Sequence, residues 1–161
     1  MIKYILSDFS QVILDAVQPD PTMGINKKYQ LLKGSSNGYS FFDHFELNAE
    51  IIELYKELRK KYPMSIFTTG YIQNDPEIRK ILDPIFEHIF SGADFNLDKR
   101  ESESYIVVAK KLGYKPDEIL YIDDLERNVN AAKESGMQAI QYTDVDSLKQ
   151  ELINRGIYDK G

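Results

Sequence analysis

The sequence predicts an α/β protein with three layers, α/β/α, built on a central parallel sheet of about five strands. Short apolar runs of strand length alternate along the chain with longer segments in which apolar residues recur at helical spacing. Glycine, proline or a capping side chain separates most of these segments. Because a strand followed by a helix returns to a parallel position in the same sheet, this alternation predicts a Rossmann-like arrangement.

The predicted strands are short apolar runs, and five can be placed in order. They lie at residues 2–6, 64–68, 88–91, 119–122 and 137–141. Continuous apolar runs of this length are typical of strands that are covered on both faces. They therefore predict a sheet that lies between two helical layers.

The predicted helices follow the strands, and capping residues mark their ends. Their ranges are 48–62, 75–82, 101–112, 126–135 and 145–155. Asn48 and Asp75 are the expected N-caps of the first two helices, and Pro76 occupies the first helical position of the second. Gly113 and Gly136 are expected to end the third and fourth helices.

Residues 16–47 break this rhythm. They predict at most one short helix, near residues 25–32, and we treat them as an insert. An aromatic run within the insert contains Tyr39, Phe41, Phe42 and Phe45. Two interpretations stay open for these rings: they anchor the insert onto the core, or they form an exposed surface for a partner, including a second copy of the chain.

Length and composition predict one ordinary folded domain over residues 1–161, with 42% hydrophobic and 29% charged residues. The net charge of -6 argues against nucleic acid and membrane surfaces as partners. The chain has no cysteine, which excludes disulfides and thiolate metal sites and favours a reducing, cytoplasmic location. The first apolar stretch is also too short for the core of a signal peptide.

Polar side chains follow the predicted strands at the edge where parallel sheets bind ligands. They are Asp8 and Ser10 after the first strand, Thr68, Thr69 and Gly70 at the second, Lys99 after the third, and Asp123 and Asp124 at the fourth. Helix capping, core packing or a solvated loop is a sufficient reason for any one of them. The whole set on one edge is harder to explain in that way.

The chemistry of these residue types favours phosphoryl transfer. A carboxylate at the mouth of a sheet can attack phosphorus and split a difficult displacement into two steps, which makes Asp8 the predicted nucleophile. Further carboxylates beside it would repel a phosphate unless a hard cation such as Mg²⁺ intervened. Asp8 and Asp124 are the expected side-chain ligands of Mg²⁺, with Asp123 either orienting them or acting as a substitute.

The remaining residues are expected to hold the phosphoryl group. The Lys99 ammonium and the Thr68 hydroxyl would bind its oxygens and stabilise the charge that develops there. Backbone N–H groups around Thr69 and Gly70 would add donors. Asn128 lies one helical turn after Asp124, so we expect it to orient that carboxylate from outside the metal site.

The ordered motifs resemble those of the haloacid dehalogenase (HAD) superfamily. The segments that carry this resemblance are YILSDFSQVILD, SIFTTG, LDKRESESYIVVAKKLG and ILYIDDLERNVNAAKESG. The resemblance covers nearly the whole chain except residues 16–47, and it implies a small phosphatase-like member with a HAD-like fold. It also implies Mg²⁺ and an aspartyl phosphate on Asp8. The insert is too short for a full helical cap, so we expect an open site.

Ser10 is the one departure from the family pattern. The resemblance implies an Asp there, acting as general acid and base, and a metal-binding backbone carbonyl. Serine keeps the carbonyl but is a poor proton donor, and losing general acid–base catalysis costs about 100- to 10,000-fold in rate. Two functions follow: a slow or specialised phosphohydrolase or phosphotransferase, or a non-catalytic protein that binds a phosphorylated ligand or a protein partner.

Two other classes of protein match the sequence less well. A metal-free dehalogenase of the same superfamily lacks the acidic pair, so Asp123 and Asp124 favour a phosphate substrate over a halide. In a response-regulator receiver domain the acidic pair follows the first strand, whereas here it follows the fourth. The expected partners are a phosphorylated small molecule or a larger phospho-substrate, and a second copy of the chain bound through the insert.

Overall fold

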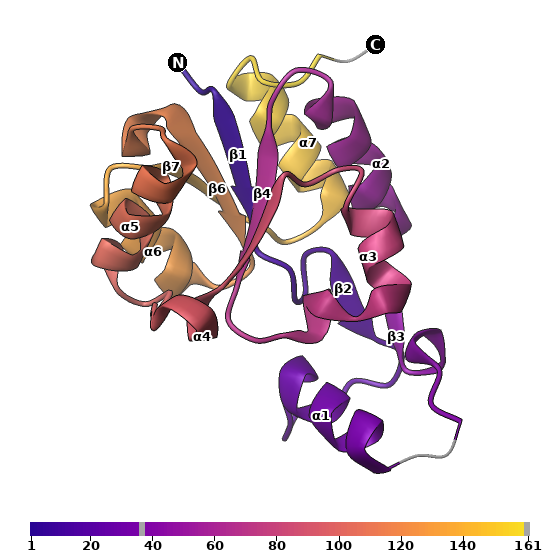
Figure 1. Ribbon diagram of the computed structural model, residues 1–161. Helices are drawn as coiled ribbons and strands as arrows, with labels where there is room; N and C mark the ends of the chain where they lie inside the picture. Colours follow the sequence, from indigo (N-terminus) through magenta and orange to yellow (C-terminus); the bar gives the residue numbers. More distant parts are fainter. Residues whose placement is uncertain (36–37, 160–161) are drawn as a thin grey trace.

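A five-stranded parallel sheet forms the centre of the protein, in the order β5-β4-β1-β6-β7 (Figure 1). This computed structural model describes residues 1–35 and 38–159. The strands are β1 (Tyr4–Ser7), β4 (Met64–Thr68), β5 (His88–Ser91), β6 (Ile119–Asp123) and β7 (Gln138–Gln141). The predicted fold class is confirmed, and β1 lies in the middle of the sheet, between β4 and β6.

Helices cover both faces of this sheet. They are α2 (Ala49–Arg59), α3 (Pro76–Leu82), α5 (Ser102–Leu112), α6 (Glu126–Glu134) and α7 (Val145–Asn154). Figure 1 shows α5 and α6 on one side of the sheet, and α2, α3 and α7 on the other. Short helical turns complete the core: η2 (Ile72–Asn74), α4 (Gly92–Phe95) and η3 (Pro116–Glu118). None of the helices in the described part of the chain is long and apolar enough to cross a membrane.

The alternation of side chains along β1 divides the core into two clusters. Ile5 packs into the cluster that includes residues of α2 and α7, while Tyr4 and Leu6 pack into the cluster on the α5 and α6 side. All three side chains are essentially inaccessible to solvent. Burial on both faces makes β1 a rigid support for the residues that follow it.

The predicted caps are present, although several element ends differ from the prediction. The Asn48 side chain accepts a hydrogen bond from the Ile51 N–H at 3.2 Å, and Gly113 and Gly136 have φ values of 80° and 95°. The first strand begins two residues later than predicted, because its ladder with β6 starts at Tyr4. The helix predicted over 48–62 ends at Arg59, since the next residues form a turn.

The insert contains more regular structure than the sequence indicates. Two short antiparallel strands, β2 (Leu14–Ala16) and β3 (Phe45–Leu47), flank it, and between them lie α1 (Ile25–Ser35) and the turn η1 (Phe41–Asp43). In Figure 1, α1 lies beyond the ends of the central strands, below α3. Strands of three residues are too short to give a recognisable alternation, so neither was predicted.

The aromatic run anchors the insert. Phe41 and Phe45 are fully buried, and both rings lie about 6.2 Å from the ring of Tyr29 in α1. The Tyr29 hydroxyl donates to Asp75 Oδ2 at 2.9 Å, which ties α1 to the N-cap of α3. The anchoring interpretation is therefore confirmed for these two phenylalanines, whereas Phe42 is 44% exposed.

We expect Asp75→Ala to lower the free energy of unfolding by about 2–4 kcal/mol, because it removes both a helix cap and a buried acceptor. Asp144 caps α7 through the Ser147 N–H but makes no such contact with the insert, so Asp144→Ala should cost less than half as much. Urea titration followed by circular dichroism measures both values. Equal costs for the two variants would contradict the anchoring role of Asp75.

Candidate active site

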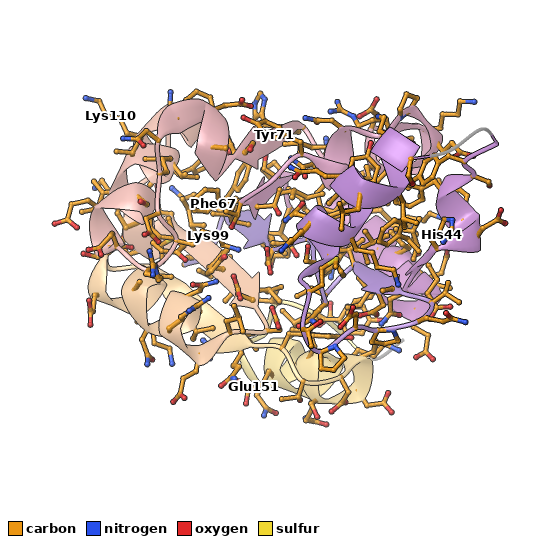
Figure 2. The ribbon with its side chains drawn as sticks, turned by 90° about the horizontal axis from the view of Figure 1, so that it is seen from below. His44, Phe67, Tyr71, Lys99, Lys110 and Glu151 are labelled. Carbon is orange, nitrogen blue, oxygen red and sulfur yellow. The ribbon has the colours of Figure 1, made fainter. Side chains whose placement is uncertain are left out.

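The carboxyl ends of β1 and β6 and the loop before α5 bring three charged side chains together. Asp8 follows β1 directly and is 6% exposed, and its N–H donates to the Ile122 carbonyl at 2.8 Å. Lys99 Nζ lies 2.6 Å from Asp8 Oδ1 and 2.7 Å from Asp123 Oδ2. Figure 2 looks onto this end of the sheet, and Lys99 lies near the centre of the view beside Phe67.

Aromatic side chains hold Lys99 in this position. Its Nζ lies 5.6 Å from the ring centroids of both Phe67 and Tyr121, and its backbone carbonyl accepts the Tyr105 hydroxyl at 2.8 Å. Burial lowers the pKa of Lys99, but the charges of Asp8 and Asp123 outweigh it, so the pKa is raised overall. The side chain is therefore a fixed ammonium, and the sequence analysis missed the two tyrosines that help to place it. Tyr121 lies two residues before Asp123, on the same face of β6, which is the signal that could have revealed it.

Asp123 already has its oxygens occupied by donors from the protein. Oδ1 accepts the Leu125 N–H at 2.8 Å, and Oδ2 accepts Asn128 Nδ2 at 3.1 Å and the Tyr121 hydroxyl as well as Lys99. The prediction that Asn128 orients Asp124 is wrong, because its amide is bonded to Asp123 instead. Asp123 ends β6 with its side chain turned into the core, within reach of the first turn of α6.

Asp124 is the more accessible member of the acidic pair, and it is half-buried. Burial, followed by the charges of Asp8 and Asp123, raises the pKa of Asp124 from an ordinary value of 3.8 to about 7. Burial also raises the pKa of Asp8, with Lys99 opposing that effect. These three carboxylates each place an oxygen within 4.8 Å of the others.

The charges and ligand atoms of this cluster fit a divalent cation. The cluster contains three carboxylates and one ammonium, which contacts Asp8 and Asp123, so an excess of negative charge remains in a largely buried place. Carboxylate oxygens are the ligands that Mg²⁺ prefers. Burial is the main cause of the raised pKa of Asp124, and the neighbouring charges of Asp8 and Asp123, which a cation would offset, are the second.

Ser10 lies in a tight turn after Asp8. Its backbone pairs with Leu14 in an isolated bridge, and Gln11 next to it adopts a left-handed conformation with φ of 63°. The Ser10 Oγ is buried and has no hydrogen-bond partner within the described residues. Ser10 thus lies two residues after Asp8, and no carboxylic acid of the described residues is hydrogen-bonded to its hydroxyl.

The segment after β4 lies next to the charged cluster. Thr68 is 2% exposed and pairs with Ser91 of β5, whereas Thr69 is exposed. The carbonyl of Gly70 accepts Gln73 Nε2 at 2.6 Å and Ser91 Oγ at 2.8 Å, which fixes the loop. Among residues 1–35 and 38–159, no protein acceptor takes the N–H of Thr69 or Gly70.

The insert reaches the same loop, a contact that the sequence analysis did not predict. A Cβ on Gly70 would lie only 2.3 Å from Asn26 Oδ1 of α1. That oxygen is buried without a partner in the described part of the chain. Asn26 therefore borders the candidate site, whereas Figure 2 shows His44 of the insert far from Lys99.

Comparison with known proteins identifies the family. The sequence profile of the haloacid dehalogenase-like hydrolases matches residues 10–142. Enolase-phosphatase E1 of Aquifex aeolicus is 34% identical over 125 residues, which cover 71% of this chain and 51% of that protein. Flavin mononucleotide hydrolase 1 of Arabidopsis thaliana is 37% identical over 59 residues, which cover 37% of this chain and 24% of that protein.

Solved structures share the fold at low sequence identity. A HAD family enzyme from Bacteroides thetaiotaomicron, crystallised with magnesium and inorganic phosphate, has a TM-score of 0.68 at 17% identity and covers 92% of this chain and 99% of its own. A 2-haloacid dehalogenase from Pseudomonas syringae has a TM-score of 0.67 at 14% identity, covering 97% of this chain and 100% of its own.

Fold, acidic cluster and profile together define a hydrolase-type α/β core. The chain belongs to the haloacid dehalogenase-like hydrolase family. It spans about half or less of the length of the relatives named above.

The pKa of Asp124 generates a prediction about stability. Between about pH 4 and pH 7 the folded, metal-free protein binds more protons than the unfolded chain, so its stability should fall as the pH rises through this window. Mg²⁺ relieves the repulsion only where Asp124 is ionised. The rise in Tm on adding Mg²⁺ should therefore be larger at about pH 8 than at about pH 6.

Asp124→Asn should abolish this Mg²⁺ response and leave the metal-free protein at about pH 8 at least as stable as the native one. Asp83→Asn, an exposed change at the C-cap of α3, is the matched control and should keep the response. Thermal unfolding with Mg²⁺ or with a chelator measures both effects. An unchanged Mg²⁺ shift in Asp124→Asn would contradict this assignment.

Proposed function

We propose that the protein is a Mg²⁺-dependent phosphohydrolase or phosphotransferase that works through an aspartyl phosphate on Asp8. The observation that carries the proposal is the pairing of Lys99 with both Asp8 and Asp123, with Asp124 next to them. This arrangement combines a nucleophile, a fixed cation and a set of hard oxygen ligands. A packing role alone would not require so many charges in one buried place.

Asp8, Asp124 and the backbone carbonyl of Ser10 would hold the metal. Asp123 is better suited to orienting Lys99 than to binding metal directly, because its oxygens already accept four donors. Bound Mg²⁺ would neutralise the charge of the phosphate and of the acidic cluster. Asn128 would not contact the metal or the phosphate, and its role would be to orient Asp123 through their hydrogen bond.

The proposed reaction has two steps at Asp8. A carboxylate oxygen of Asp8 attacks phosphorus, a new P–O bond forms and the bond to the leaving oxygen breaks. Lys99, Thr68 and the N–H groups of Thr69 and Gly70 bind the phosphoryl oxygens as their charge increases. Water, or another acceptor in a transferase, then attacks phosphorus, and the carboxylate of Asp8 is released.

Ser10 limits the rate of this sequence. Its hydroxyl protonates the leaving oxygen poorly in the first step and activates water poorly in the second, a loss of about 3–5 kcal/mol in barrier. Good leaving groups need no such proton, so acyl phosphates should react faster than alkyl phosphates. The same serine favours a second candidate function, in which the protein binds a phosphorylated ligand or a protein partner without turnover.

Substrate, partners and location remain predictions. The related phosphatases support a phosphorylated substrate. It could be a small molecule or a larger one, because an insert too short for a full helical cap would leave the site open. A homodimer through the insert and a cytoplasmic location also stay predictions.

The proposal predicts Mg²⁺-dependent hydrolysis of p-nitrophenyl phosphate and acetyl phosphate that Asp8→Asn abolishes. Ser10→Asp should raise turnover of p-nitrophenyl phosphate by about 100-fold or more, because it restores the acid and base. Ser10→Ala keeps the backbone carbonyl and should behave like native protein. The release of p-nitrophenol and of inorganic phosphate measures these rates. No turnover in native protein and none in Ser10→Asp would overturn the enzyme proposal in favour of binding.

A further inference from the structure

A cavity of about 480 Å³ opens beside the candidate active site. Its lining includes Thr69 and Lys99 of the candidate site and Arg127 and Asn128 of α6. Its volume lies in the range of small-molecule sites. Figure 1 shows α4, α5 and α6 together on one side of the sheet, away from α1, and neither Asn26 nor Gly70 belongs to the lining of this cavity.

The lining of the cavity has an unbalanced positive charge. Asp98 is its acidic residue, and its carboxylate is already paired with the Arg100 guanidinium at 2.6 Å. Hydrogen bonds from Arg100, with a smaller contribution from the charge of Arg127, lower the pKa of Asp98 to about 2. Lys99 is likewise balanced by Asp8 and Asp123.

Arg127 has no equivalent partner. Within the described residues its guanidinium makes no hydrogen bond or ion pair, and its side chain is exposed at the cavity. It lies on the first turn of α6, one residue before Asn128, which is bonded to Asp123. The helix therefore fixes the attachment point of an unpaired arginine side chain at the edge of this cavity, next to Asn128, in a chain whose net charge is -6.

We infer that this cavity binds a second anionic group of the substrate, with Arg127 as its principal contact. The preferred substrates would then be small phosphorylated acids, in which a carboxylate or a second phosphate accompanies the phosphoryl group that reacts. A guanidinium recognises either anion through paired, charge-assisted hydrogen bonds. The inference rests on the proposed phosphoryl transfer at Asp8, in which Lys99 and Thr68 bind the phosphoryl group that reacts.

Phosphonates with and without a distal carboxylate separate the two ideas. In the presence of Mg²⁺, calorimetry would compare phosphonoalkanoates with one to four methylene spacers against alkylphosphonates of the same length. Binding of the alkylphosphonates tests the phosphoryl site, and the gain from the carboxylate tests the cavity. Propane-1,3-bisphosphonate shows whether a carboxylate or a second phosphoryl group is the better match.

The expected result is a gain of about tenfold in affinity from the carboxylate at the best spacer length. Arg127→Gln should remove this gain and leave alkylphosphonate binding unchanged, and Arg127→Lys should restore part of it. Arg155→Gln removes the same charge at the end of α7, outside the cavity lining, and should keep the gain.

Two results would overturn the inference in different ways. If alkylphosphonates bind but the carboxylate adds nothing at any spacer length, or Arg127→Gln keeps the gain, the cavity is not an anion site while the proposed function stands. If no phosphonate binds at all, the proposed phosphoryl site fails and the inference fails with it.

Discussion

The contact of Lys99 with Asp8 and Asp123 is the interaction on which the rest of the site depends. It joins three segments that are far apart in the sequence: the end of β1, the end of β6 and the loop before α5. Removing charged groups from water is costly, and losing one partner of a buried ion pair typically costs about 3–5 kcal/mol. The formation of this buried cluster, with Asp124 beside it, therefore adds little net stability to the fold. Under the proposed function, its role is the chemistry at Asp8.

The order of the strands makes this contact possible. Because β1 lies between β4 and β6, the residues that follow its last position face those at the ends of both neighbours. Asp8 therefore lies between the Thr68 side of the site and the Asp123 side. Burial of β1 on both faces, through Tyr4, Ile5 and Leu6, leaves this position little freedom to move.

Much of the fold and part of the site could be predicted from the sequence, because both depend on local patterns. Apolar runs, Asn48, Asp75 and the terminal glycines mark the central strands and helices. Because Asp8, Lys99 and the acidic pair follow the ends of predicted parallel strands, the strand positions also locate these residues at one edge of the sheet. The partner of Asn128 could not be predicted, since helical spacing alone does not tell which of two adjacent carboxylates turns into the core.

The features that were missed depend on tertiary packing. The strands β2 and β3 have three residues each and form only against one another. The contact of Asn26 with Gly70 arises because aromatic anchors fix α1 near the loop after β4, and no local pattern records that distance. The cavity at Arg127 also results from packing, since its lining comes from separate segments of the chain.

The central claim is that Asp8 becomes phosphorylated, and an acid-quench experiment tests it most directly. Native protein would be mixed with radiolabelled acetyl phosphate and Mg²⁺, quenched in acid and digested, and the labelled peptide sequenced. The account predicts label on Asp8, at a higher level in native protein than in Ser10→Asp, because serine slows the hydrolysis of the aspartyl phosphate. Absence of label from native protein, or its persistence in Asp8→Asn, would contradict the account.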